Sequence, residues 1–364
     1  MLNDHEHKNT VNGKSHGKIT SKRKALMIMG ALLLLVIVAV SALALPLFFN
    51  KSPAEALIKV PQGATDDQVC DSISKYLGDD FASHVSWGLR FIGFRQGNHH
   101  GAYLITEGMS PLKAANMICK NRQSGINVVI NGQRTKADLA RRLASYLDFS
   151  EEEMLAALND KELLGKYETD PRYVMGFFLN DTYQFYWTAT PEEVIAKMSE
   201  HYRSFWTNKR QIKAEDLGLS PRQVTILSTI VDEETNVADE KGRIGRLYIN
   251  RIDQHMKLQS DPTVRFALND FTIKRISLED TKVDSEYNTY LHEGLPKGHL
   301  RTPEAATIDS ILNSRPSSDL YMCADPSLNG RHRFAATYAE HQRNAAEYQA
   351  KLDQLQIHRN AAAK

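Results

Sequence analysis

The sequence predicts an α+β protein made of one N-terminal transmembrane helix, a small α+β module and a larger mixed α+β domain. Three observations support this fold class. An uncharged run occupies residues 25–49, a strand, glycine turn and capped helix recur three times between residues 57 and 143, and a long helical pattern begins at Ser220. The 364 residues, 42% hydrophobic and 24% charged, suffice for two or three domains with buried cores.

The uncharged run ALMIMGALLLLVIVAVSALALPLFF is long enough to cross a bilayer, for which about 20 apolar residues suffice. Basic residues precede it and only Lys51 directly follows it, so the positive-inside rule predicts a cytoplasmic basic tail at 1–24, a single pass at 25–49 and a periplasmic remainder. Residues 42–44, Ala-Leu-Ala, resemble a signal-peptide cleavage site. The run exceeds the usual h-region of about 7–15 residues, which favours an uncleaved anchor in the cytoplasmic (inner) membrane.

Three strand-turn-helix units follow the anchor. Their strands are expected near 57–60, 102–105 and 128–130, and each is followed by a glycine turn and a helix-capping signal. The caps are Thr65 with Gln68, Ser110 with Pro111, and Thr135 with Asp138. The first two units and the segment 81–94 between them resemble the LysM-type fold, which binds glycans containing N-acetylglucosamine. We therefore expect a LysM-like module at 55–125, acting either in carbohydrate binding or as a structural spacer.

The remaining chain is expected to form a second domain over residues 126–357. Helices are predicted at 148–204, including a Ser150-x-x-Glu153 capping box, with an aromatic-rich interruption at 173–187. A long helical pattern runs from Ser220 to about residue 257. Loops rich in Thr, Asn, Gly and Pro then extend to residue 303, and a final helix lies beyond residue 338.

Glu234 occupies an unusual position in the helix that begins at Ser220. At about 100° per residue it falls on the apolar stripe formed by Leu227, Ile230 and Val231, whereas the neighbouring acids at 232 and 233 fall off that stripe. Burial raises the pKa of a carboxyl, which is what a general acid at neutral pH requires. The structural alternative is a glutamate that turns back to water or pairs with a nearby arginine, such as Arg243 or Arg246.

Other classes of function find little support. The formal charge of +1 gives no reason to expect a nucleic-acid partner. No nucleophile elbow, zincin helix, Walker A loop or dinucleotide fingerprint occurs, and no cofactor or metal is expected. Three scattered cysteines exclude a disulfide scaffold, and whether Cys70 and Cys119 pair stays open. The histidines match no ligand spacing and are expected to be solvated or to anchor loops: His5, His7 and His16 in the tail, and His292, His299, His332 and His341.

Five motifs around and after Glu234 closely resemble the MltG or YceG-like family of bacterial endolytic murein transglycosylases. They are Ile230-Val231-Asp232-Glu233-Glu234-Thr235, Tyr248-Ile249-Asn250-Arg251, Leu258-Gln259-Ser260-Asp261-Pro262-Thr263-Val264, Tyr287-Asn288-Thr289-Tyr290 and Gly294-Leu295-Pro296. The likeness extends upstream through the Asp181-Thr182-Tyr183 run and downstream to His332-Arg333-Phe334. It covers nearly all of the chain after the anchor.

The resemblance implies a lysozyme-like helix that carries the catalytic acid Glu234, followed by Thr235. It implies sugar binding by a group of cleft residues: Thr235, Gln259, Asp261, Thr263, Tyr287, Asn288, Thr289 and Tyr290. Tyrosine faces stack on sugars, and amide and carboxylate groups hydrogen-bond hydroxyls, so these assignments are chemically reasonable. The sequence departs from the family pattern at Asp232, Asn180 and Lys297, which bears on the shape of loops and the rim of the cleft.

The resemblance further implies lytic cleavage of the MurNAc-GlcNAc β-1,4 bond within peptidoglycan glycan strands, giving 1,6-anhydro-MurNAc ends and limiting strand elongation. The cytoplasmic membrane and cell wall synthases are the implied partners. Two alternatives stay open. One is a muramidase that hydrolyses with Asp261 or Glu286 as a second carboxylate. The other is a membrane-tethered peptidoglycan-binding adaptor without turnover.

Overall fold

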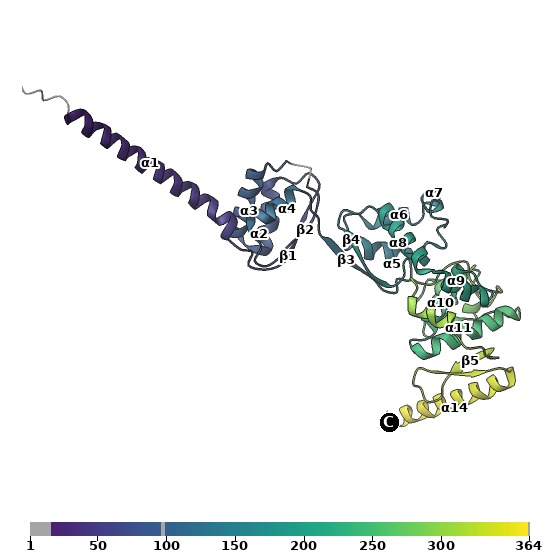
Figure 1. The fold of residues 1–364 in the computed structure, drawn as a ribbon. Coiled ribbons are helices and arrows are strands. Elements are labelled where there is room, and N and C mark those ends of the chain that lie inside the picture. The colour runs from purple at the N-terminus through teal and green to yellow at the C-terminus, as the bar shows by residue number, and fades with distance from the viewer. Residues whose placement is uncertain (1–15, 96–98, 363–364) are drawn as a thin grey trace, which may run out of the picture. The chain divides into compact units, whose positions relative to one another are not determined.

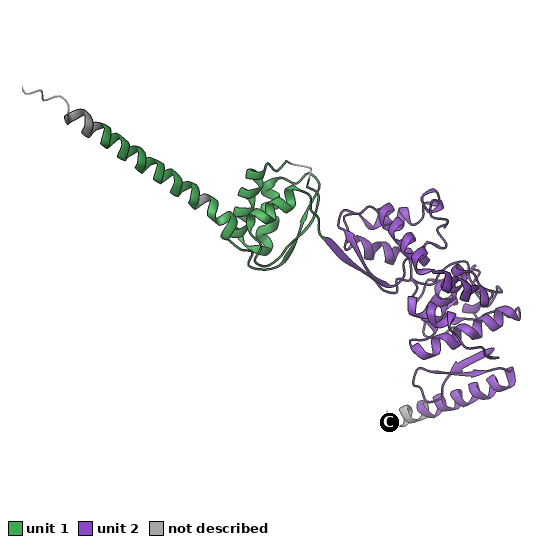
Figure 2. Ribbon diagram, in the orientation of Figure 1, with its two compact units in different colours: residues 1–124 green, residues 125–364 purple. Residues whose placement is uncertain are grey.

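The computed structural model describes residues 16–95 and 99–362 and shows a mixed α+β protein (Figure 1). The chain divides into two compact units, Met1–Ser124 and Gly125–Lys364 (Figure 2). The mixed α+β class predicted from the sequence is confirmed. The tail histidines His5 and His7 lie outside the described residues.

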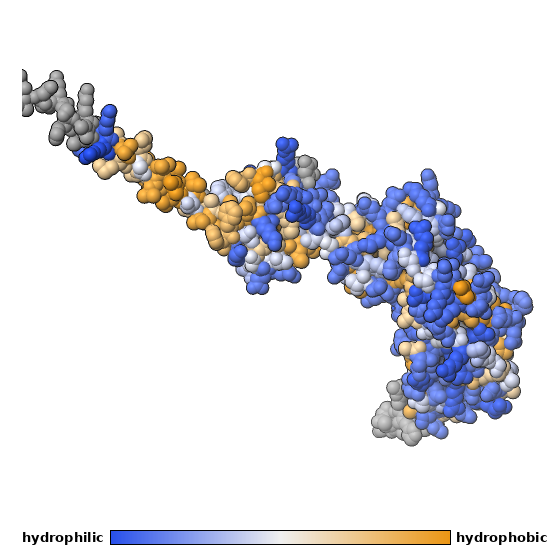
Figure 3. All heavy atoms as spheres, viewed as in Figure 1, coloured by the Kyte–Doolittle hydropathy of each residue, from blue (hydrophilic) through white to orange (hydrophobic). Residues whose placement is uncertain are grey.

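Helix α1, His16–Phe49, carries the uncharged run. Its segment Lys22–Phe49 is the one helix in the described part of the chain that is long and apolar enough to span a membrane. Its apolar side chains are exposed along the helix, which appears as an orange rod in Figure 3. Leu47, near its end, is buried and faces Gly88 of the same unit. The helix is thus compatible with a membrane anchor whose end packs against α3 of the same unit.

The remainder of unit 1 packs three helices with a two-stranded antiparallel sheet. Strand β1 pairs with β2 so that Ile58 lies opposite Tyr103. The predicted caps are present: Thr65 and Gln68 form a reciprocal capping box, and Ser110 caps the helix that has Pro111 at its first position. The elements are β1 Ala56–Val60, α2 Asp66–Leu77, α3 Asp79–Ile92, β2 Gly101–Ile105 and α4 Pro111–Cys119.

The first part of unit 2 is built on a second antiparallel pair. Strand β3, Gly125–Ile130, pairs with β4, Asp181–Tyr186, with Val128 opposite Tyr183. The capping boxes at Thr135 and Ser150 form as the sequence predicts. The other elements of this part are α5 Lys136–Ala144, α6 Glu151–Ala157, α7 Lys161–Gly165, the 3-10 turn η1 Val174–Phe177, α8 Pro191–Phe205 and α9 Asn208–Asp216.

The second part of unit 2 surrounds helix α10, Pro221–Glu234, which starts with the predicted Ser220 cap and Pro221. The prediction of one long helix reaching residue 257 is wrong. The extended backbone of Thr235 ends α10, and a new helix begins at Ala238. The loops expected up to residue 303 also contain a short helix, α12. The further elements are α11 Ala238–Asp253, α12 Asp261–Leu268, η2 Asp280–Lys282, α13 Ala305–Leu312, β5 Tyr321–Ala324, β6 His332–Ala335 and α14 Tyr338–Ala362.

Helix α10 is buried over most of its circumference. Every residue from Val224 to Asp232 is buried, including Thr225, Ser228 and Thr229. The expectation that Asp232 points away from the buried face is therefore wrong: other elements of unit 2 cover both sides of the helix, so helical phase alone does not separate inside from outside. Its side chains Val224, Leu227, Ile230 and Val231 belong to a hydrophobic core of this unit.

Candidate active site

A pocket of about 410 Å³ opens at the C-terminal end of α10. Its lining comes from the end of α10, from α11, from α12 and the segment before it, from the loop with Tyr290, from the β5–β6 hairpin and from α14. Most of the lining side chains are polar. Among the residues selected from the sequence, Glu234, Gln259, Asp261 and Tyr290 line this pocket. The structure thus brings four of the nine candidate residues together on one surface.

Glu234 is the last residue of α10, and two hydroxyl groups hold its carboxyl. Tyr248 Oη donates to Oε1 at 2.7 Å, and Ser260 Oγ donates to the same oxygen at 2.5 Å. Both hydroxyl residues are almost fully buried. Among the described residues no hydrogen-bond donor contacts Oε2 of Glu234, so this oxygen is available to carry a proton.

Burial raises the pKa of Glu234, and the hydrogen bonds from Ser260 and Tyr248 offset only part of that effect. The nearby Asp261 carboxylate raises the pKa further, since two negative charges in one pocket repel each other. Glu234 therefore retains a proton to higher pH than an exposed glutamate. This is the property expected from a general acid that protonates a leaving group.

Three further candidate residues shape the pocket beside Glu234. Tyr290 Oη donates to Asp261 Oδ1 at 2.6 Å, which fixes that carboxyl at the start of α12. Gln259 is exposed, has φ of 52° and donates its backbone N–H to the Thr289 carbonyl at 3.1 Å. A carboxylate, a phenol and an amide thus lie along one wall, and each can hydrogen-bond a sugar hydroxyl.

The other five candidates lie outside the pocket lining, and four of them lie in α12 and in the loop with Tyr290. Thr263 Oγ1 and Thr289 Oγ1 lie 2.8 Å apart, and Ser260 N donates to Thr289 Oγ1 at 3.1 Å. Asn288 Nδ2 donates to two loop carbonyls. All three are at most 1% exposed, and Tyr287 packs its ring on Phe266 with centroids 4.5 Å apart. These side chains hold the loop that carries Ser260 and Tyr290.

Thr235 ends α10 and sets the direction of the chain after Glu234. Its side-chain Oγ1 accepts the Val237 N–H at 3.0 Å, and its own backbone N–H donates to the Val231 carbonyl at 3.1 Å. The residue is buried and lies outside the pocket lining. Its observed contacts end the helix, so that Glu234 lies at the pocket and α11 returns past it.

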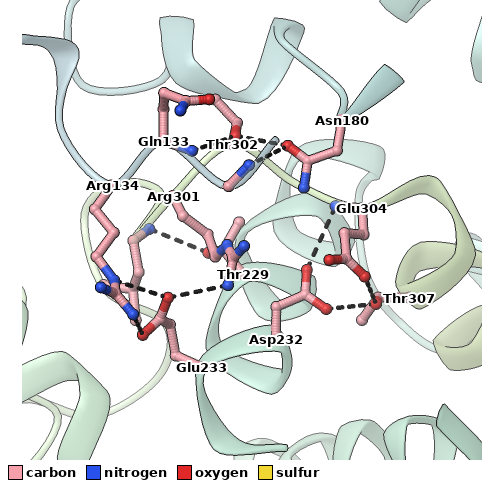
Figure 4. Close-up of polar contacts among 12 residues, drawn as sticks. Gln133, Arg134, Asn180, Thr229, Asp232, Glu233, Arg301, Thr302, Glu304 and Thr307 are labelled. Atoms are coloured by element: carbon pink, nitrogen blue, oxygen red, sulfur yellow. Dashed lines mark hydrogen bonds and ion pairs between the residues drawn. The ribbon is translucent and has the colours of Figure 1, made fainter. Parts of the chain in front are cut away.

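The two acids that precede Glu234 are held by cations instead. Lys241 Nζ lies 2.8 Å from Asp232 Oδ1. Thr307 Oγ1 donates to the same oxygen at 2.5 Å, a contact drawn in Figure 4. Glu233 lies between Arg134 and Arg301, at 2.9 Å and 3.1 Å. Arg243 and Arg246, which the sequence offered as partners for Glu234, make no such contact with it among the described residues.

The loop that carries Leu300 and Thr302 connects α10 to the β3–β4 part of unit 2. Leu300 N donates to Thr229 Oγ1 at 3.1 Å, and Thr302 Oγ1 donates to Asn180 Oδ1 at 2.7 Å. Asn180 Oδ1 also accepts the Gly132 N–H at 2.9 Å. Figure 4 shows the hydrogen bond between Thr302 and Asn180 in the same network. The unusual asparagine at position 180 thus joins two loops that support the helix.

Sequence reasoning assigned no role to several residues that form the pocket. The motifs contain Tyr248 and Ser260, but nothing in the sequence assigned them a contact with Glu234. For Tyr248, the one indication was a tyrosine hydroxyl on a helix face expected to be buried. His332 and His341 also line the pocket, and His332 Nδ1 lies 3.2 Å from Glu240 Oε2. Of the two expectations for these histidines, solvated or loop-anchoring, the solvated one is wrong for His299, which is buried.

The structure also bears on three points raised by the sequence: the cysteines, a second carboxylate and metal ligands. Cys70, Cys119 and Cys323, all described, are free thiols. Glu286 is exposed and lies outside the pocket lining, whereas Asp261 shares the pocket with Glu234. Within residues 16–95 and 99–362, no group of three His, Cys, Asp or Glu side chains is arranged to hold a metal ion.

The sequence profile of the YceG-like family matches residues 58–347, which include unit 1 after β1 begins and every residue of the Glu234 pocket. The chain belongs to the YceG-like family. The family predicted from the motifs around Glu234 is therefore confirmed.

Two relatives and one solved structure extend this result. The endolytic murein transglycosylase of Bacillus subtilis is 23% identical over 314 residues, covering 80% of this chain and 84% of that protein. The enzyme of the same name from Streptococcus pneumoniae D39 is 28% identical over 162 residues, covering 43% of this chain but only 28% of that protein. A YceG-like protein from Listeria monocytogenes shares the fold, with a TM-score of 0.53 and 22% identity over 79% of this chain and 98% of that chain.

Proposed function

We propose that this YceG-like protein is an endolytic murein transglycosylase, a lyase that cleaves the MurNAc-GlcNAc bond within peptidoglycan strands. Relatives of that name and the family match support the activity class. The observation that carries the assignment of the residue is the Glu234 carboxyl: it lies in a polar pocket, its pKa is raised by burial, and two hydroxyls orient one of its oxygens.

In the proposed reaction Glu234 first donates its proton to the glycosidic oxygen, and the bond from that oxygen to C1 of MurNAc breaks. The ionised Glu234 then accepts the proton of the C6 hydroxyl of the same sugar, whose oxygen bonds to C1. The products are a free GlcNAc hydroxyl and a 1,6-anhydro-MurNAc end, and Glu234 regains its starting proton. The internal nucleophile has a high effective concentration and requires no activated water.

The other side chains of the pocket are assigned supporting roles. Asp261 can stabilise the positive charge that develops at C1, and Tyr290 keeps its carboxylate in place. Gln259 is exposed on the pocket wall and suits a sugar hydroxyl. We assign the buried Thr263, Asn288 and Thr289, with Tyr287 and Thr235, to the support of these residues, which revises the direct sugar contacts that the resemblance implied.

Hydrolysis by two carboxylates is the second candidate, because Asp261 lines the same pocket as Glu234. Glu286 is exposed and lies outside the pocket lining, which disfavours Glu286 as the second carboxylate. The adaptor alternative requires no acid in a pocket, and the arrangement around Glu234 argues against it.

We further propose the organisation that the sequence predicted: a cytoplasmic tail at 1–24, a membrane helix at 25–49, a LysM-like module at 55–125 and a catalytic domain at 126–357 with a lysozyme-like helix α10. Basic residues before the apolar run, among them Lys18, Lys22, Arg23 and Lys24, support the orientation, with unit 2 in the periplasm. Contact with cell wall synthases fits this location. Protease added to spheroplasts should digest unit 2, and full protection would exclude the orientation.

Product analysis tests the activity. The full chain in detergent should convert purified, uncrosslinked glycan strands into shorter strands whose ends are about 18 Da lighter than hydrolysis products, because ring closure replaces the addition of water. Mass spectrometry reports both strand length and end mass. Unchanged strands would support the adaptor, and reducing ends of full mass would support the hydrolase.

A further inference from the structure

The end of α1 and helix α3 of unit 1 lie against each other and run in opposite directions. Asn50, the residue after α1, donates its side-chain Nδ2 to Asp80 Oδ2 at 2.9 Å and lies 3.2 Å from His84 Nδ1. Further along α3, a Cβ added to Gly88 would lie 3.8 Å from Leu47, about one turn earlier in α1. The C-terminal end of α3 therefore extends from Asn50 back toward the apolar run.

Unit 1 also covers the last part of that run. The side chains of residues 22–40 are exposed on α1, whereas Ser41 and Ala44 are half-buried and Leu47 is buried. These three positions are spaced by three residues and lie on one side of the helix. The surface of α1 stays apolar up to the point where it meets the rest of unit 1 (Figure 3). The covered side therefore extends about 9 Å along the run, for six residues at about 1.5 Å each.

The apolar run is longer than the hydrocarbon core of a bilayer. Its 25 residues extend about 37 Å at about 1.5 Å per residue, whereas the core is about 30 Å thick. When the first residue of the run lies at one boundary of the core, about the last five residues reach the headgroup region on the other side. The stretch from Ser41 to Leu47 then crosses the boundary between hydrocarbon and headgroups, and the part of α3 beside it lies at the same depth.

The exposed side of α3 changes character along its length. Asp80, His84, Trp87 and Phe91 follow one another at intervals of four, three and four residues, so they form one stripe along the helix. The first two contact Asn50. The last two are 39% and 75% exposed, and their rings stack with centroids 6.4 Å apart. The polar end of the stripe thus meets the residue after α1, and its aromatic end lies toward the apolar run.

The charges on this end of α3, and those bonded to it, balance one another. Arg90 Nε donates to Asp66 Oδ2 at 2.6 Å, and its Nη2 donates to Asp67 Oδ1 at 2.9 Å. Arg95, just after the helix, is exposed. These two cations and two anions sum to zero. The acids at the start of α3 lie about 16 Å from Phe91 along the helix, for 11 residues at about 1.5 Å each. The aromatic end of the stripe therefore presents rings without net charge.

We infer that Trp87 and Phe91 dock in the headgroup region of the bilayer that α1 crosses, so that unit 1 rests on the membrane surface. Aromatic side chains favour this region, because the ring packs against acyl carbons while the indole N–H reaches polar groups. The occupant is lipid because the rings lie beside the apolar run itself. The inference goes beyond the proposed lyase activity, and it rests on the proposed membrane insertion of α1.

Fluorescence quenching by brominated lipid tests this contact. The full chain is reconstituted into phosphatidylcholine vesicles that carry bromine near the headgroup end of the acyl chains, and into matched vesicles without bromine. Trp187 and Trp206 are buried in unit 2, so Trp87 is the exposed one of the three tryptophans. Brominated lipid should remove up to about a third of the emission, the share of one tryptophan in three. Trp87→Phe should abolish this quenching.

Two variants in the Trp87→Phe background locate the contact on α3. Phe91→Trp should restore quenching. Asp80→Trp, at the polar end of the same stripe, should be quenched at least twofold less. Both positions are exposed, so neither substitution disturbs the core of unit 1. Absence of quenching at both Trp87 and Phe91→Trp, or equal quenching of Asp80→Trp and Phe91→Trp, would overturn the contact.

Flotation of the same vesicles separates the causes of failure. Protein that does not float with the vesicles would overturn both the insertion of α1 and the contact, whereas protein that floats without quenching would overturn the contact alone. A change in Trp87 emission on addition of soluble glycan strands, without quenching by brominated lipid, would assign the stripe to saccharide binding and also overturn the contact. None of these measurements uses turnover, so the lyase activity can fail while the contact stands, and the reverse.

Discussion

Asp232 and Glu234 lie two residues apart at the end of α10, yet the protein surrounds their carboxyls differently. Asp232 contacts the ammonium of Lys241, and its side chain is 1% exposed. Glu234 accepts hydrogen bonds from two neutral hydroxyls. Burial raises the pKa of both, but only Asp232 has a cation in direct contact to offset it. The comparison teaches that burial alone does not distinguish the two acids, whereas the chemical character of their partners does: a cation beside Asp232 and neutral hydroxyls beside Glu234.

The largest expected effect is the loss of turnover in Glu234→Gln. The amide keeps the shape of the side chain but has no acidic proton, so cleavage should fall by about 10²–10⁴-fold. Strand cleavage followed by mass spectrometry gives the rate. Leu227→Ala, a core variant expected to lose roughly 2–5 kcal/mol of unfolding stability, controls for destabilisation. Normal turnover in Glu234→Gln would exclude this residue as the acid.

Breaking the ion pair between Asp232 and Lys241 should lower the unfolding stability. Lys241→Met leaves a buried carboxylate without its cation, and we expect a loss of about 3–5 kcal/mol in the free energy of unfolding, measured with urea. The double variant Asp232→Asn with Lys241→Met should recover part of that loss, because no unpaired charge remains. A double variant as unstable as the sum of both single variants would contradict the pairing.

The Glu234 carboxyl should also make the unfolding stability depend on pH. The folded state raises the pKa of Glu234, so between its unfolded value near 4.5 and its higher folded value the folded protein binds more protons, and stability falls as pH rises. Glu234→Gln removes this pH-dependent contribution to stability. Its stability relative to the wild type should therefore increase from pH 4 to pH 8 in urea unfolding, and a constant difference would show that the carboxyl is not desolvated.

The smallest effect is expected beside Glu233. Arg134 is 42% exposed, and Arg301 remains paired with Glu233 when Arg134 is removed. Arg134→Met should therefore change unfolding stability by less than about 1 kcal/mol and leave turnover in place. A loss as large as that of Lys241→Met would mean that Glu233, like Asp232, depends on a single cation.

Local signals were predictable from the sequence, whereas long-range packing was not. Caps at Thr65, Thr135 and Ser220 form because a hydroxyl and a side chain three residues later satisfy the first backbone N–H groups, a purely local condition. The pairing of β3 with β4 joins segments about fifty residues apart, which no local pattern specifies.

The site was predictable to a similar extent. Helical phase and motifs selected Glu234, but phase misjudged Asp232, because its burial depends on helices that pack from both sides. The hydroxyls of Tyr248 and Ser260 reach Glu234 only after the chain breaks at Thr235 and folds back. Residues that act through such folding carry no signal in the spacing of the sequence.

Digestion of glycan strands in heavy-oxygen water tests the central claim most directly, namely that Glu234 serves as the only essential carboxyl. The account predicts 1,6-anhydro ends without solvent oxygen, since the C6 oxygen of the same sugar closes on C1 and no base activates water. Ends that are predominantly reducing and carry one heavy oxygen would contradict it. That result would assign the reaction to two carboxylates, with Asp261 as the partner of Glu234.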